Sequence, residues 1–158
     1  MAEYTLKKVK QYDGREGPGF SAEIYRDGQF AGNVVDAGNG GSFSIYMMRD
    51  ERKLFLETVA EWQVKRNAPD MLEPSDRYLN ELLELHRMRK AVRRIVTKNG
   101  AKLKEMKEAS ARIARKNKLP LKNWYAVVKQ GTDGAYALTG EYAFSVAPDS
   151  VPEFWIPL

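Results

Sequence analysis

The sequence lacks the residues on which several kinds of protein chemistry depend. None of its 158 residues is cysteine, which excludes disulfides, thiolate metal sites and cysteine nucleophiles. Its single histidine, His86, argues against a histidine-based zinc site or proton relay. No Ser/His/Asp or paired-carboxylate set has an interpretable spacing either. We therefore expect no metal site, no cofactor and no catalytic residues.

Long apolar runs are also missing. No stretch approaches the roughly 18 residues of a membrane span, and the opening MAEYTLKKVK has no apolar signal-peptide core. Because cysteine is absent as well, a reducing cytoplasm is the simplest expectation, with no membrane contact. Neither GxGxxG nor GxxxxGK[ST] occurs, so the common nucleotide-binding fingerprints are absent.

The composition that is present fits one folded domain, residues 1–158. Hydrophobic residues make up 43% and charged residues 30%, which is ordinary for a globular protein with a real core. The net charge of +5 conceals an asymmetry, however. Residues 87–118 hold thirteen Lys/Arg and two Asp/Glu, a charge of +11, and the remainder is −6. An acidic body with a basic helical insert is therefore predicted.

Residues 4–48 predict an antiparallel β-meander at the start of an α+β fold. Apolar and polar side chains alternate over residues 20–26, as in a half-buried strand. Asp27-Gly28 then supplies a tight hairpin turn. The returning strand is expected to place Phe30 and Val34 together on the core face.

Two glycine-rich connections, residues 13–19 and 36–41, must lie at the same end of such a meander. Their backbone N–H groups could hold an anion or a small ligand. Alternatively, Gly and Asp serve here only as turn residues, which is their commoner role in loops. The candidate ligand residues are Gly17, Gly19, Gly38, Asn39, Gly40 and Gly41.

The helical part is predicted to cover residues 50–118. A first helix follows Asp50, its expected N-cap, and turns Phe55, Val59 and Trp62 inward. A linker with two prolines, residues 67–74, separates it from the next helix.

The long helix expected over residues 75–98, with Ser75 as N-cap, organises the chain. Its second half is apolar on one side and basic on the other. A third helix, 101–117, carries a thin apolar stripe that includes Met106 and Ile113. The basic side chains of these two helices are candidates for binding phosphate or an acidic protein, although a basic helix face can also be merely solvated. The candidate residues are Arg87, Arg89, Lys90, Arg93, Arg94, Lys98, Lys102 and Arg112.

Residues 123–158 return to a period of two after Pro120 and predict an antiparallel strand pair. We expect this pair to join or pack on the same core as the meander. The apolar tail, residues 154–158, is expected to pack on its own fold rather than form an interface, since exposed apolar clusters are uncommon on monomers.

The run FSAEIYRDGQFAGNVVDAGNGG, followed by MRDERKLFLETVAEW, resembles a family of small uncharacterised phage, prophage and plasmid proteins. Their shared pattern is F-S-A-x-I-Y-x-D-G-x-x-x-G, then an acidic residue, a G-x-G-G loop and two helices. The resemblance covers about residues 18–97, and the basic segment 98–118 departs from it. It implies a small α+β fold, a mobile-element origin and the cytoplasm of an infected bacterial host, but no activity.

Three kinds of function stay open from the sequence. The first is a phage-type accessory protein that occupies a host or anti-phage-defence protein, as the resemblance and the lack of catalytic groups suggest. The second is nucleic-acid binding through the basic helices of residues 87–118. The third, an enzyme, has no motif to support it. The sequence favours a protein partner narrowly over nucleic acid, and it does not set the oligomeric state.

Overall fold

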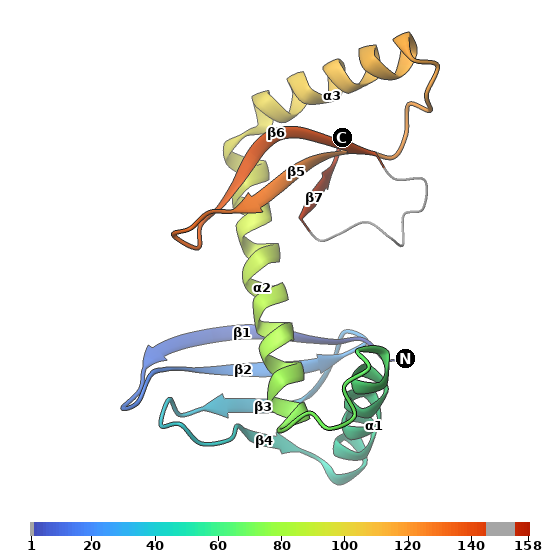
Figure 1. The fold of residues 1–158 in the computed structure, drawn as a ribbon. Helices are drawn as coiled ribbons and strands as arrows, with labels where there is room; N and C mark the ends of the chain where they lie inside the picture. The colour runs from blue at the N-terminus through green and yellow to red at the C-terminus, as the bar shows by residue number, and fades with distance from the viewer. Residues whose placement is uncertain (1, 145–153) are drawn as a thin grey trace. The chain divides into compact units, whose positions relative to one another are not determined.

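The computed structural model describes residues 2–144 and 154–158 and divides the chain into two compact units. The first unit comprises Met1–His86 and the second Arg87–Leu158. Helix α2, Pro74–Lys98, contributes its first half to the first unit and its second half to the second (Figure 1).

The first unit is an antiparallel sheet with helices α1 and α2 packed on one face (Figure 1). The strand order β1-β2-β3-β4 follows the chain, which confirms the predicted meander and the α+β class. The hairpin turn between β2 and β3 has positive φ at both Asp27 (49°) and Gly28 (82°), as its sequence predicted. The elements are β1 (Tyr4–Asp13), β2 (Pro18–Arg26), β3 (Gln29–Asp36), β4 (Ser44–Met47) and α1 (Arg49–Lys65).

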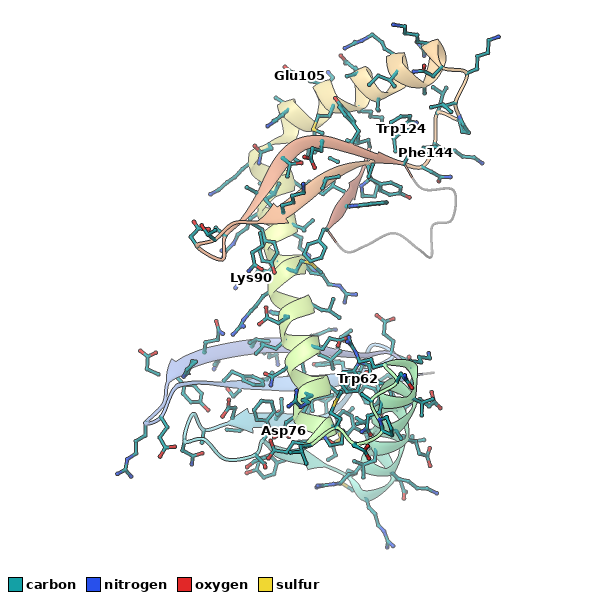
Figure 2. The ribbon with its side chains drawn as sticks, viewed as in Figure 1. Trp62, Asp76, Lys90, Glu105, Trp124 and Phe144 are labelled. Atoms are coloured by element: carbon teal, nitrogen blue, oxygen red, sulfur yellow. The ribbon has the colours of Figure 1, made fainter. Side chains whose placement is uncertain are left out.

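Aromatic side chains join the helices to this sheet. Phe55 of α1 is 1% exposed and meets the ring of Tyr4 edge-on at 5.3 Å. Trp62 (Figure 2) packs against Tyr78 of α2 at 5.5 Å between ring centroids. Val59 is buried with them. The predicted inward face of α1 is therefore confirmed.

The prediction for Phe30 is wrong. Its side chain is 58% exposed and meets Tyr25 edge-on at 5.8 Å on the face away from the helices. The pairing of β2 with β3 shifts between Ile24 and Tyr25, which leaves Ala31 as an extra residue in β3. Such a bulge reverses the alternation before it, so Ala31 faces the core instead.

Helix ends differ slightly from the sequence prediction. The N-cap of α1 is Met48, which makes no side-chain cap bond, and Asp50 lies in the first turn. Helix α2 begins at Pro74 rather than after Ser75, because proline suits the first helical position, where no N–H is needed.

The second unit has a sheet of its own with the order β6-β5-β7. It contains the end of α2, α3 (Gly100–Lys116), β5 (Trp124–Gln130), β6 (Tyr136–Phe144) and β7 (Trp155–Pro157). A separate cluster of buried side chains fills it: Ile95, Met106, Ala126, Val128 and Ile156. The described C-terminal strands thus form a separate sheet with a buried cluster of its own, and do not join the sheet of the meander. On α3 the expected Ile113 is 38% exposed, and Ser110 and Ala114 are buried beside Met106.

The apolar tail packs on its own unit, as predicted. Strand β7 pairs antiparallel with β5, and Ile156 is only 6% exposed. The Val128 N–H donates to the Phe154 carbonyl at 2.8 Å, and the Leu158 N–H to the Trp124 carbonyl at 3.0 Å. Trp124 also meets Phe144 of β6 at 5.3 Å (Figure 2).

A basic groove as the candidate functional site

An open groove of about 620 Å³ lies in the second unit. The corner between α2 and α3 forms one wall, and the other comes from the β5–β6 turn with the start of β6. The lining residues are Ala91, Arg94, Ile95, Lys98, Asn99 and Lys102 on the helices, and Gly134, Ala135, Tyr136, Ala137 and Leu138 on the hairpin.

The α2–α3 corner brings the groove's cations together. Arg94 and Lys98 are four residues apart on α2 and therefore share one flank. Only Asn99 separates the two helices, and its backbone N–H and its side-chain amide both donate to the Ile95 carbonyl at 2.9 Å. Lys102 follows in the first turn of α3 and completes the basic wall.

The opposite wall is a tight turn closed by its own hydrogen bonds. The Gly131 N–H donates to the Ala135 carbonyl at 2.8 Å, and the Gln130 side chain donates to the Gly134 carbonyl at 3.0 Å. Tyr136 leaves this turn at the start of β6, half-buried, with its ring stacked on Phe154 at 6.2 Å. An aromatic residue therefore lines the same groove as the cations.

The positive charge of the groove is not neutralised within the described part of the chain. Across residues 2–144 and 154–158, Arg94, Lys98 and Lys102 have no ion-pair or hydrogen-bond partner. The whole second unit carries fifteen Lys/Arg and six Asp/Glu, a formal charge of +9, against −4 for the first unit. Like charges one helical turn apart repel each other, and a bound anion would relieve this repulsion.

The structure separates the eight basic residues singled out from the sequence. Arg94, Lys98 and Lys102 line the groove. Lys90, Arg93 and Arg112 are exposed outside its lining. Arg87 and Arg89 are half-buried, and each takes part in an interaction within the chain.

Sequence reasoning missed the other members of the groove. Tyr136 and the turn residues before it gave no signal, because nothing local pairs them with α2. Asn99 with Gly100 predicts only a helix end, although a break of one residue between two basic helices brings their ends together.

The two glycine-rich loops of the first unit lie at the same end of the sheet, as predicted, and pack on each other. The Glu16 N–H donates to the Gly38 carbonyl at 2.7 Å. The Tyr12 hydroxyl lies 2.5 Å from the Asp36 carbonyl of the second loop. The Gly38 and Gly41 N–H groups donate to Asp36 and Asn39 side chains within their own loop. Several backbone N–H groups of the loops are therefore already hydrogen-bonded within the loops, which favours a role as turns. Ligand binding by the loops stays a prediction.

The charged groups of the first unit form structural pairs. Arg26 of β2 donates to both oxygens of Glu51 of α1, at 2.8 and 3.1 Å, and the Tyr4 hydroxyl donates to the same carboxylate at 2.9 Å. The hydrogen bond from Arg26 lowers the pKa of Glu51 below its usual value. Asp76 accepts the Phe43 N–H at 2.9 Å, and burial raises its pKa. These contacts tie α1 to β2 and α2 to the residue before β4.

Comparisons with protein-family models, curated proteins and solved structures found no match. In residues 2–144 and 154–158, His, Cys, Asp and Glu form no group of three that could hold a metal ion. None of the described helices combines the length and apolar character of a membrane span. The charge and geometry of the groove are therefore the features from which a function can be inferred.

Proposed function

We propose that this protein acts by binding, and that its second unit binds the phosphate backbone of nucleic acid in the basic groove. The observation that carries this proposal is the convergence of Arg94, Lys98 and Lys102 on one concave surface, without partners in the described part of the chain. Phosphate contacts need clustered cations of this kind, and an arginine fork binds two phosphate oxygens at once.

Convergence is the feature that favours binding over simple solvation. A solvated helix face spreads its charges outward, where water and salt screen them. Here three cations from two helices face a shared hollow, so their potentials add where a ligand would sit. A few phosphate contacts predict modest affinity that falls with salt, with a slope of log affinity against log salt of about −2 for three phosphates on a single strand.

Charge reversal in the groove tests the proposal. The double variant Arg94→Glu, Lys98→Glu should abolish binding of oligonucleotides at low salt, measured by fluorescence anisotropy. The matched control is Arg93→Glu, Arg112→Glu, which makes the same change in net charge at exposed positions outside the groove lining. We expect the control to keep most of the affinity, because its charges act only through the long-range field.

Two results would contradict the proposal. One is a wild-type protein that binds no DNA or RNA at low micromolar concentration in low salt. The other is equal weakening by the two double variants, which would mean that the groove has no special part. Melting curves of both variants serve as folding controls, since all four side chains lack partners in the described residues.

A protein partner is the second candidate, and the outer face of the first sheet supports it. Phe30 and Tyr46 are 58% and 61% exposed on this face. Strand register places both opposite the buried side of the sheet, with Tyr25 paired with Phe30 and Asn33 paired with Tyr46. Exposed aromatic side chains in a patch are typical of protein interfaces. The resemblance to phage and prophage proteins makes a host or anti-phage-defence protein the partner to seek.

The partner candidate has its own test. Nuclease-treated bacterial lysate is passed over the immobilised wild type and over a Phe30→Ser, Tyr46→Ser variant, whose changes lie outside the core. A protein retained by the wild type and lost from this variant, but kept by the Arg94→Glu, Lys98→Glu variant, supports the candidate. Equal retention by all three proteins contradicts it.

A further inference from the structure

Building on the proposed function, we infer that the groove takes single-stranded rather than duplex nucleic acid, with an unpaired base stacked on Tyr136. The structural basis is the placement of an aromatic ring and three cations around one hollow. Proteins that hold single strands combine these two elements: cations follow the backbone, and aromatic rings stack on the bases.

Tyr136 is held in a way that suits it to stacking. The residue pairs with Gln130 in the β5–β6 ladder, next to the closed turn. Its ring stacks on Phe154 with 26° between the planes, and Phe154 is itself 40% exposed. Within the described residues neither ring has another aromatic partner. A base added to this pair would extend an existing stack and lose little side-chain freedom.

The size of the groove agrees with an unpaired nucleotide. About 620 Å³ lies in the range of roughly 300–1,000 Å³ that small-ligand pockets occupy. A duplex keeps its base faces inside its own stack and presents only base edges in its grooves. Its phosphates could reach Arg94 or Lys98, but no base face could reach Tyr136.

Contacts to the base edges of a duplex would instead require an exposed helix face to enter its major groove. The apolar side of α2 is unavailable for this, because Met88 and Ile95 are buried. Arg93 lies on the exposed side and outside the groove lining. The two modes of binding thus depend on different residues: Tyr136 for a single strand and Arg93 for a duplex.

The first experiment uses the unaltered protein, so that folding is not in question. Anisotropy titrations compare labelled oligo-dT, oligo-U, an abasic strand of equal length and a duplex of that length. We expect oligo-dT or oligo-U to bind about tenfold more tightly than the abasic strand, since one stacked base contributes on this scale, and more tightly than the duplex. Oligo-dU compared with oligo-U, which differ only in the 2′-hydroxyl, identifies the sugar that the site prefers.

The second experiment changes the ring. Tyr136→Phe should keep the preference for oligo-dT over the abasic strand, and Tyr136→Leu should lose it. Tyr142→Leu is the matched control, because Tyr142 is half-buried on the same strand and packs on the same core, but does not line the groove. Arg93→Ala should leave single-strand binding unchanged.

The outcomes separate the two proposals. Equal affinity for oligo-dT and the abasic strand, or tighter binding of the duplex, overturns the inference and leaves phosphate binding in place. A Tyr136→Leu variant that keeps the full preference overturns it as well. Absence of binding to every oligonucleotide in low salt overturns the proposed function itself.

Discussion

The two units of this chain use charged side chains in opposite ways. In the first unit, Arg26 and Glu51 bind each other across the sheet and helix, and Lys8 pairs with Glu23 between neighbouring strands at 2.9 Å. In the second unit the cations of the groove have no partner in the described residues. Paired charges add specificity to a fold, whereas unpaired like charges cost stability. The first unit therefore pairs these charges within its own fold. The second unit has the pair Lys129–Glu141 at 2.8 Å, but leaves the groove cations unpaired within the described residues.

The two units also differ in the side chains that fill their cores. The first contains Phe55, Trp62 and Tyr78 in edge-on or tilted contacts. The second is filled mainly by aliphatic and small side chains. Each has its own sheet, so the comparison predicts that a core mutation affects one unit more than the other.

The largest effect is expected from Trp62→Ala. Removing this side chain from the first core should lower the free energy of unfolding by about 3–5 kcal/mol. Hydrogen exchange followed by mass spectrometry should show lost protection in β2, with β5 protected as before. Equal loss in both strands would contradict the separation of the two cores, and a melt like that of the wild type would contradict the burial of Trp62.

Ile156→Ala is the corresponding change in the second unit. Its side chain fills a core shared with Ala126 and Val128, so we expect a loss of about 2–3 kcal/mol, the lower part of the range because β7 is a short edge strand. Protection should fall in β5 and stay constant in β2. A variant with unchanged stability would mean that the tail does not pack as described.

Glu51→Gln tests the charge pairing of the first unit. The folded-state pKa of Glu51 is lowered by Arg26, so its stabilisation is present above the unfolded pKa, near 4.5, and is lost as the pH falls through the folded value. We expect a cost of about 1 kcal/mol at neutral pH, and this cost should shrink as the solution becomes acidic. Glu57→Gln, an exposed change on the same helix, is the control and should show no such trend in urea denaturation.

The smallest effect is expected from Phe30→Ser. An exposed side chain with one edge-on contact should cost less than about 1 kcal/mol. Urea denaturation measures this directly. A cost of core size would mean that Phe30 faces inward and that the bulge at Ala31 is misplaced.

The sequence predicted the three helices and strands β1 to β6, because each has a local period or stop signal. It predicted that the tail packs on its own fold, but not that the tail forms strand β7 of the second sheet. It did not predict on which face of the sheet Phe30 lies. One extra residue in β3 reverses the alternation of the strand, and no local sequence pattern signals such a bulge. It also assigned Ile113 to the buried stripe of α3 by hydrophobicity, whereas Ile113 is 38% exposed and the polar Ser110 is buried.

The groove was only half predictable. Its cations were identified because they lie on neighbouring helices with a clear amphipathic pattern. Tyr136 was not, because its position across the groove from Lys98 depends on how a hairpin more than thirty residues later in the chain packs against the helices. Amphipathic periodicity says nothing about such long-range contacts.

The interlocked glycine loops have a consequence for strand alignment. A side-chain carbon added at Gly14 would lie 2.5 Å from the backbone of Gly38, and one at Gly38 would lie 2.5 Å from the Gly17 carbonyl. If β1 or β3 slid by one residue, a bulkier neighbour such as Arg15 or Ala37 would have to enter this space. Contact between backbones therefore excludes the slipped sheets that an alternating pattern alone would tolerate. The packed loops thus help to fix the strand register of the meander, and the register decides on which face of the sheet each side chain lies.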